Sequence, residues 1–412
     1  MGGAASSKLP IVIEEEDEAG GGNAGGGRHN YTGLENFGTT CYVNSVLQSL
    51  YFCSPFRRKL FEYHTSVINA ETKVGGEMPS GVKRGDALLV HLVGLFQAIA
   101  RCKTSQGYVS PRKFTKKLRV QNAMFDNDDH HDAHEFLNYL LNDISECVQH
   151  DKAQARKRSK KADATGRGEV GGGSSINKTW IDEIFGGVVR SKMKCLTCEC
   201  VTTNDQAVLD VSVETSEDST LSECLLRSTD KEYMQGRDKA FCEHCNSLQE
   251  AERSMHLVEA PNVLAVHLKR FKFLEEMQRH TKLRHRVQFP DTMDLRCPDE
   301  NERRRRGEDG TKVGEEEVGE IVTRYRLRSV IAHIGSGSMH GHYVAMVRKN
   351  NRWVLFDDEE VDPVGEDAVK LCYGSGEANS NGLDPATSKA KRKAASQVGY
   401  ILFYEALEDA VV

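Results

Sequence analysis

Cys41 is the residue whose type and position point most clearly to covalent chemistry. It stands near the start of a segment, 40–52, whose apolar residues recur at helical spacing, namely Val43, Val46, Leu47 and Leu50. A thiol in the first turn of a helix faces unpaired backbone N–H groups and the positive end of the helix dipole, which favour the nucleophilic thiolate. The sequence therefore predicts a nucleophile at Cys41. The alternative is a buried structural cysteine.

Asn36 and two glycines precede this cysteine and suit the same chemistry. The amide of Asn36 offers N–H donors beside the thiol, where the oxyanion of a tetrahedral intermediate needs stabilisation. Gly33 and Gly38 would let the backbone approach a substrate closely. These residues predict an oxyanion site next to Cys41.

A nucleophilic thiolate needs a base, and we interpret His342 as that base. A glycine-rich segment, 335–341, leads into an apolar run at His342, and a second apolar run ends at Asp357 and Asp358. Two adjacent strands would bring Asp357 beside His342, where the carboxylate accepts a ring N–H and fixes the tautomer. We prefer His342 because it stands at a strand edge, where rigid backbone can aim it. The rival histidines are His333 and His340.

Two Cys-x-x-Cys pairs have the spacing of metal ligands. They are formed by Cys195 with Cys198 and by Cys242 with Cys245. Two such turns can enclose one tetrahedral Zn²⁺, and four thiolates leave no open position, so we expect one structural zinc ion. The pairs lie farther apart than those of a compact zinc ribbon, which favours a zinc that joins the tips of long strands. Two surface turns without metal are the alternative. Spare ligands in these segments are Cys200 and His244.

The elements that would hold these residues follow from hydrophobic spacing. Helical spacing predicts helices over 40–52 and 132–148. Short runs rich in β-branched and aromatic residues predict strands at Val208–Val213, Val263–Leu268, Arg326–Ile331, Tyr343–Val347 and Tyr400–Tyr404. Because the helices come first and the strands later, the predicted fold class is α+β and not an alternating βαβ fold.

Composition narrows the function classes. The 412 residues include 55 Lys and Arg against 61 Asp and Glu, and this net charge of −6 argues against a general nucleic-acid binder. A zinc-dependent nucleic-acid binder is the alternative that the cysteine pairs and the Arg303–Arg306 run suggest. The longest apolar stretch, 87–100, is too short to span a bilayer. Polar or glycine-rich composition predicts disorder in four segments, 1–30, 151–176, 298–320 and 374–397.

The first residues carry one further signal. No apolar leader opens the chain, so we expect a reducing compartment and a cytoplasmic or nuclear location, or both. Met1–Ser6 fits the myristoylation pattern, with Gly2 as the acceptor. One acyl chain binds membranes only reversibly, and the acidic run Glu14–Glu18 is repelled by anionic lipid. We therefore expect at most weak membrane association.

Several of these segments resemble, in order, the motifs of the ubiquitin-specific proteases, peptidase family C19. The resemblance covers 31–406 and rests on Gly33–Ser45, Asp132–Leu137, Val266–Phe271, Gly341–Tyr343, Phe356–Asp358 and Tyr400–Tyr404. It is closest to the small single-domain branch that WD40-repeat partner proteins activate. It implies a papain-like fold with a thumb (31–180), zinc-bearing fingers (about 186–265) and a palm formed by the remainder. The implied activity is that of a thiol isopeptidase, which hydrolyses the bond after the C-terminal Gly-Gly of ubiquitin on protein conjugates.

The resemblance also implies roles for single residues. Cys41 matches the nucleophile, His342 the general base, Asp357 the residue that orients the base, and Asn36 the oxyanion donor. Asp358 is a candidate to share the role of Asp357, because the motif alone does not apportion two adjacent carboxylates. The four paired cysteines match the zinc ligands of the fingers.

Two positions depart from the family pattern. Thr39 stands where the family usually has Asn, and His131 stands where it usually has Gln. We expect little effect from Thr39, whereas His131 would alter contacts to the ubiquitin tail or add a pH dependence. A catalytically silent ubiquitin-binding adaptor with a misaligned triad is the second alternative to an active enzyme.

Overall fold

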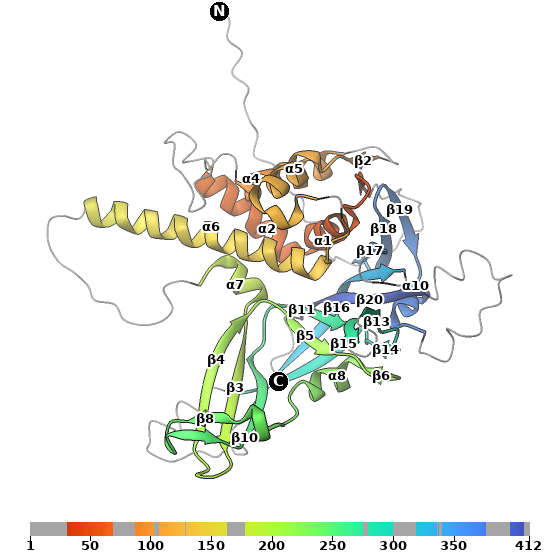
Figure 1. Ribbon diagram of the computed structural model, residues 1–412. Helices are drawn as coiled ribbons and strands as arrows, with labels where there is room; N and C mark the ends of the chain where they lie inside the picture. The colour runs from red at the N-terminus through yellow and green to blue at the C-terminus, as the bar shows by residue number, and fades with distance from the viewer. Residues whose placement is uncertain are drawn as a thin grey trace, which may run out of the picture.

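The computed structural model places a group of helices on a large sheet, from which a narrow arm of strands extends (Figure 1). Within the residues it describes, no helix is both long and apolar enough to cross a membrane. The described residues are 31–68, 87–102, 107–127, 129–162, 178–274, 279–299, 319–335, 337, 340–375 and 396–407. Gly2, the acidic run and most of the three predicted inserts lie outside them.

The helical part is built around α1, which is buried over Cys41–Leu50. Its apolar stripe packs on α6 on one side and on the central sheet on the other. A capping box starts α7, because the Thr179 hydroxyl and the Asp182 carboxylate each accept an N–H from the other residue. The helices and turns of this part are α1 (Cys41–Phe52), α2 (Ser54–Tyr63), η1 (His64–Ile68), α4 (Leu88–Arg101), α5 (Arg112–Gln121), η3 (Ala123–Phe125), α6 (Ala133–Ala162) and α7 (Trp180–Phe185).

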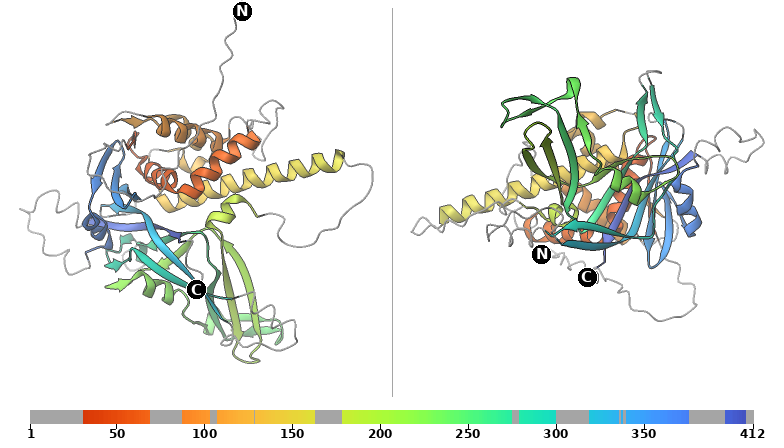
Figure 2. Two further views of the ribbon diagram at one scale, coloured as in Figure 1. Left: turned by 180° about the vertical axis from the view of Figure 1, so that it is seen from behind. Right: turned by 90° about the horizontal axis from the view of Figure 1, so that it is seen from below.

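Helix α6 is longer than the sequence analysis predicts. It continues to Ala162 and so includes the first part of the segment 151–176, for which disorder was the wrong expectation as far as Ala162. The physical reason is composition, since 152–162 consists mostly of Lys, Arg, Ala and Gln, which favour helix even without an apolar face. The end of α6 projects beyond the other helices in all the views of Figures 1 and 2.

The central sheet has the strand order β19-β18-β17-β16-β20-β11-β5, with β15 pairing beside β16. All its neighbours are antiparallel except β11 and β5. The strands are β5 (Val211–Glu214), β11 (Val263–Lys269), β15 (Thr292–Pro298), β16 (Glu320–Ile334), β17 (His342–Lys349), β18 (Arg352–Asp357), β19 (Glu360–Val364) and β20 (Gln397–Ala406).

Both faces of this sheet are buried. On β11, Val263 and Ala265 face the helical core, whereas Leu264 and Val266 belong to a second core on the opposite face. This alternation with a period of two explains why β11 and β20 are almost continuously apolar, as expected for strands covered on both sides. The sheet therefore holds its strand ends, where the polar motif residues stand, on a rigid base.

The arm consists of β3, β4, β7, β8, β9 and β10. Four of these strands form a sheet of order β4-β3-β10-β7, and β8 pairs with β9 at the far end. Most of the arm is exposed, and nearly every residue of β4 lies open to solvent. The arm strands are β3 (Gly187–Cys195), β4 (Val201–Val208), β7 (Glu232–Met234), β8 (Ala240–Cys242), β9 (Ser247–Gln249) and β10 (Ala251–Glu259).

The expected strand Val208–Val213 is wrong as a single element. Strand β4 ends at Val208 and β5 begins at Val211, so the chain leaves the arm and enters the central sheet between them. Asp210 lies at this break, and its carboxylate accepts a hydrogen bond from His134 of α6 at 2.7 Å instead of continuing a strand. The other expected strands all lie within observed ones.

Short elements complete the fold. Strand β1 pairs with β2 near the start of α1, β6 pairs with β14, and β12 forms a hairpin with β13. These elements are β1 (Gly33–Leu34), β2 (Tyr108–Val109), β6 (Ser219–Thr220), α8 (Leu221–Arg227), η5 (Gly236–Asp238), β12 (Phe271–Leu274), β13 (Arg279–Lys282), β14 (Val287–Gln288), α10 (Glu366–Lys370) and η8 (Leu371–Tyr373).

Candidate active site

Cys41 is the first residue of α1 and is 1 % exposed. The turn before it requires a glycine, because Gly38 has a φ of +96°, a conformation that side chains disfavour. Thr40 closes this turn by accepting the Phe37 N–H at 3.0 Å through its hydroxyl. The thiol therefore stands where the unpaired N–H groups of a helix start are available to a negative sulfur.

His342 lies between Cys41 and Asp357. Strand β17 begins at His342 and its antiparallel neighbour β18 ends at Asp357, so the two residues meet at one end of the sheet. The Nε2 atom of His342 hydrogen-bonds Oδ1 of Asp357. This leaves Nδ1 as the ring nitrogen available to Cys41, whose thiol interacts with the imidazole.

These contacts set the charge of the imidazole. Burial lowers the pKa of His342, but hydrogen bonds to Asp357 and Cys41 outweigh burial and raise this pKa to about 10. The imidazole is therefore protonated near neutral pH when the thiol beside it is ionised. A thiolate and an imidazolium held in contact are the charge state that nucleophilic cysteine chemistry requires.

Asp358 has partners different from those of Asp357. Its Oδ2 accepts from Asn36 Nδ2 at 2.6 Å and its Oδ1 accepts from Asn44 Nδ2 at 2.8 Å. The nearer oxygen of Asp358 stands 3.8 Å from Nε2 of His342. Burial raises the pKa of Asp358, against the effect of the two amides and the imidazole. The two adjacent acids thus differ in their hydrogen bonds, since Asp357 bonds the imidazole and Asp358 bonds the asparagine amides.

Asn36 is held at both ends of its side chain. Its Oδ1 accepts from the backbone N–H of Thr40 at 3.2 Å and from the Thr40 hydroxyl at 3.1 Å. Its Nδ2 donates one N–H to Asp358, and an amide nitrogen carries a second N–H that can donate to another acceptor. Asn44 was missed by the sequence analysis, although a polar residue three positions after Cys41 on a buried helix was a usable signal.

Gly33 serves the site differently from the expected contact with substrate. A Cβ atom at Gly33 would lie 2.5 Å from the carbonyl oxygen of Glu359 and 2.6 Å from that of Asp358. The neighbouring Leu34 N–H donates to the Asp358 carbonyl at 2.8 Å. The glycine therefore allows the chain before α1 to lie directly against the chain after β18, which brings Asn36 to Asp358.

The two rival histidines occupy other places. His333 is buried within β16, where its ring packs edge-on against Tyr343 at 4.9 Å, and burial lowers its pKa to about 3. His340 is exposed and precedes the strand. His342 is thus the histidine that the structure brings to both Cys41 and Asp357.

His131 packs against the residue that follows Cys41. Its ring lies edge-on to Tyr42 at 5.4 Å and to Phe125 at 5.2 Å, and its Nε2 is 2.6 Å from Oδ1 of Asn127. Burial lowers the pKa of His131. A histidine at this position thus serves as an aromatic support for the start of α1.

Three further motif segments meet near the site. The Tyr400 hydroxyl of β20 donates to the Asp132 carboxylate at the start of α6. The ring of His134 stacks on that of His267 with 3.8 Å between centroids, while Nε2 of His134 contacts Asp210. Burial lowers the pKa of His267 to about 3, so this ring is neutral at pH 7. The motifs were located in the sequence, but these contacts between them were not anticipated.

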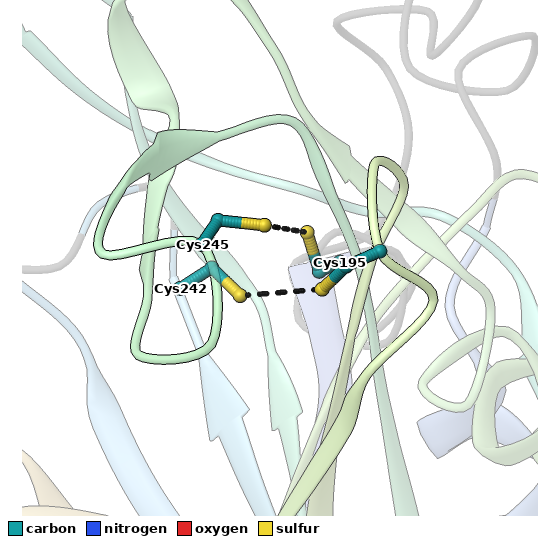
Figure 3. Close-up of side chains that lie close together, drawn as sticks. Cys195, Cys242 and Cys245 are labelled. Carbon is teal, nitrogen blue, oxygen red and sulfur yellow. Dashed lines mark hydrogen bonds between the residues drawn. The ribbon is translucent and has the colours of Figure 1, made fainter.

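The four paired cysteines come together at the end of the arm (Figure 3). Sγ of Cys195 lies 4.0 Å from Sγ of Cys245, and Sγ of Cys198 lies 3.6 Å from Sγ of Cys242. Four sulfurs around one tetrahedral zinc at about 2.3 Å would be roughly 3.8 Å apart, so the arrangement fits a metal ion. The spare ligands Cys200 and His244 do not belong to this group.

Comparison with known proteins identifies the family. The family of ubiquitin carboxyl-terminal hydrolases matches residues 32–404. Ubiquitin carboxyl-terminal hydrolase 4 of Arabidopsis thaliana is 36 % identical over 387 residues, which cover 92 % of this chain and 93 % of that protein. Ubiquitin carboxyl-terminal hydrolase 12 of Salmo salar is 37 % identical over 377 residues, covering 91 % and 90 %.

Solved structures confirm the predicted α+β, papain-like fold. A chain of the SAGA Ubp8/Sgf11/Sus1/Sgf73 DUB module bound to ubiquitin aldehyde matches with a TM-score of 0.62 and 21 % identity, over 92 % of this chain and 70 % of that one. A variant of the same module bound to monoubiquitin matches with a TM-score of 0.61 and 20 % identity, over 92 % and 70 %. The chain therefore belongs to the ubiquitin carboxyl-terminal hydrolase family of cysteine-type deubiquitinating enzymes.

Proposed function

We propose that this deubiquitinating hydrolase acts through Cys41 as nucleophile, His342 as general base and acid, Asp357 as the residue that orients His342, and Asn36 as oxyanion donor. One observation carries the assignment, namely that His342 hydrogen-bonds Asp357 and lies close enough to Cys41 for the thiol to raise the pKa of the imidazole, although the three residues come from different elements. The substrate bond follows the C-terminal Gly-Gly of ubiquitin on protein conjugates.

The reaction runs in two halves. The Cys41 thiolate, whose proton His342 holds, attacks the carbonyl carbon of the last ubiquitin glycine, and a C–S bond forms as the carbonyl oxygen takes the negative charge. The free N–H of Asn36 and backbone N–H groups stabilise this oxyanion. The C–N bond then breaks as His342 protonates the leaving lysine amine. Water, deprotonated by His342, hydrolyses the thioester and releases the ubiquitin carboxylate and the thiol.

Asp358 acts in this scheme as a positioning residue for the oxyanion donor. Its contacts to Asn36 and Asn44 support this role, because a carboxylate that accepts from both amides fixes the direction of each. Asp357 alone then orients the imidazole. The two acids divide the labour instead of sharing it.

The paired cysteines are proposed to bind one structural zinc ion that ties the β3 turn to the β8–β9 hairpin. The sulfur spacing and the absence of an open coordination position in a four-thiolate set support this role. The arm then corresponds to the fingers (about 186–265), the helical part to the thumb (31–180) and the central sheet to the palm, as the family resemblance implies.

Three further proposals go beyond the chemistry, and only the first rests on the family resemblance. WD40-repeat proteins are proposed to activate the enzyme, and the enzyme is proposed to work in the cytoplasm, the nucleus or both. Myristoylation of Gly2 is proposed to give weak membrane association. The intact mass of protein from a eukaryotic host tests the last point, because an unmodified Gly2 would contradict it.

An electrophilic ubiquitin probe tests the catalytic assignment. The probe carries a thiol-reactive group in place of the last glycine, and we expect it to label wild-type protein at Cys41, as located by peptide mass spectrometry. The variant Cys41→Ala should lose labelling and turnover while it still binds ubiquitin, and Cys53→Ala is a matched control that keeps both. Unchanged turnover in Cys41→Ala, or labelling of another cysteine, would refute the assignment. Correct folding with no labelling of wild type, even with WD40 partners, would favour the silent adaptor.

A further inference from the structure

Lys282, the last residue of β13, is a buried cation with an unusual set of partners. It is 6 % exposed, and its ammonium donates to three backbone carbonyls, those of His333 at 3.0 Å, Gly335 at 2.9 Å and Ser396 at 2.9 Å. An ammonium has three N–H groups, so all its donors are used. Its charge has no carboxylate partner among the ion pairs of the described residues.

Two of the three carbonyls belong to the backbone just before the proposed general base, and the third belongs to the start of β20. His333 and Gly335 flank Ile334, the last residue of β16, and Ile334 pairs directly with His342 across the sheet. Ser396 lies next to Gln397, which pairs with Ile334 from the other side. The ammonium therefore joins the end of β16 to the start of β20, at the position where β17 begins with His342.

The backbone at this position is packed too closely to move freely. Gly335 has a φ of +124°, and a Cβ atom there would lie 2.9 Å from Cα of Gly341, the residue before His342. A Cβ atom on Gly341 would in turn overlap the ring of His333. Any displacement of the His333 and Gly335 carbonyls is thus passed through direct contact to Gly341 and on to His342.

We propose that Lys282 is a positioning residue for His342, whose ammonium holds the end of β16 so that the imidazole stays between Cys41 and Asp357. This inference rests on the proposed function, since it assigns His342 as the base. It explains why a cation is buried at a place where an apolar side chain would leave three carbonyls without a donor.

Two effects of opposite sign act on the charge of Lys282. Burial, followed by the charges of Arg284 and Arg270, lowers the pKa of Lys282 to about 7. The three carbonyl dipoles are the groups that favour its charged form. His333, the ionisable ring next to this cluster, has a pKa lowered by burial and by Lys282 itself, so it adds no competing charge at neutral pH.

Arg270 offers a matched control. It is also a fully buried cation that donates to carbonyls, with Nε 3.1 Å from Gly399 and Nη1 2.5 Å from His285. Its side chain donates to the carbonyls of Gly399, His285 and Tyr373, and none of these bonds reaches Gly335 or Gly341. A substitution at Arg270 therefore tests the effect of disturbing a buried cation without disturbing the backbone next to His342.

The experiment compares Lys282→Met, Lys282→Arg and Arg270→Lys in the full chain. For each variant we would measure kcat and KM on a fluorogenic C-terminal amide of ubiquitin, the rate at which iodoacetamide alkylates Cys41, and the melting temperature. We expect Lys282→Met to lower kcat about 10- to 100-fold, with KM within about threefold, because a misplaced catalytic group costs that much. Alkylation of Cys41 should slow as well, Lys282→Arg should restore most of both, and Arg270→Lys should change only the melting temperature.

Three outcomes would overturn the proposal. The first is a folded Lys282→Met with kcat and alkylation rate within about twofold of wild type. The second is an equal loss of kcat in Arg270→Lys. The third is that neither Lys282→Met nor the neutral Lys282→Gln, which replaces it if it does not fold, gives folded protein. Lys282 would then be required for folding alone. Labelling of a cysteine other than Cys41 by the ubiquitin probe would instead refute the proposed function, whatever the Lys282 variants do.

Discussion

Asp358→Asn is the substitution that best separates the two adjacent acids. The exchange keeps the size of a buried side chain and removes its charge, but an amide has one acceptor oxygen, whereas Asp358 accepts from Asn36 at 2.6 Å through Oδ2 and from Asn44 at 2.8 Å through Oδ1. One of these bonds therefore becomes a bond to a neutral oxygen and the other is lost. Bonds to charged groups contribute about 1.5–3 kcal/mol and neutral ones about 1 kcal/mol. The lost orientation of Asn36 should therefore cost about 1–2 kcal/mol in the transition state, which is roughly a 5- to 30-fold lower kcat.

A double-mutant cycle shows whether this cost passes through Asn36. Asn36→Ala removes an oxyanion donor outright and should lower kcat by about 10²–10³-fold. If Asp358 acts only through Asn36, the double variant has the kcat of Asn36→Ala alone, and the coupling free energy equals the whole effect of Asp358→Asn. The assay is single-turnover and steady-state hydrolysis of a fluorogenic ubiquitin amide.

Alkylation of Cys41 supplies the second readout. Asp358→Asn should leave the rate of reaction with iodoacetamide unchanged, because the imidazole keeps Asp357. The control Asp357→Asn should slow it, because the Asp357 carboxylate helps to raise the pKa of His342 to about 10. Two results together would refute these separate roles of Asp357 and Asp358. The first is a kcat in the double variant that is lowered by the product of the two single losses, and the second is slower alkylation in Asp358→Asn.

Three other predictions concern charge and metal. His342 has a folded pKa raised from 6.5 to about 10, so its contribution to stability is complete below about pH 6.5 and is lost as the pH rises through about 10. The free energies of unfolding of wild type and His342→Gln, measured by chemical denaturation, should therefore converge near that upper pH. Cys242→Ser should abolish bound zinc in elemental analysis and raise KM for ubiquitin while alkylation of the catalytic thiol continues, whereas the exposed Cys200→Ser should change neither. Asp143 has a pKa raised by burial from 3.8 to about 6, so ionising its carboxyl costs stability as the pH rises from 3.8, and this cost is complete above about pH 6. Asp143→Asn should therefore raise the free energy of unfolding at pH 7.5 by about 1–3 kcal/mol. An unchanged or lower free energy of unfolding would contradict this prediction.

Much of the fold could be predicted because its elements carry local patterns. The stripe from Val43 to Leu50 predicts α1, and the apolar runs at 263–268 and 400–404 predict central strands that the structure confirms. The break at Asp210 and the length of α6 were missed. Asp210 contacts a side chain of α6 at the break between two strands, and α6 is extended by helix-forming residues that have no apolar face.

The sequence by itself determined which residues have the chemistry, since a thiol at a helix start, a histidine at a strand edge and two Cys-x-x-Cys turns are visible in short segments. Only the tertiary structure decided which of them work together. His342 contacts Asp357, and Asp358 contacts Asn36, because strand register and the backbone contact at Gly33 set the direction of each carboxylate. Lys282 carries no motif, and its partners are backbone carbonyls that exist as a group only after distant strands have paired. Side-chain partners in a sheet depend on register, and register is a property of the folded chain.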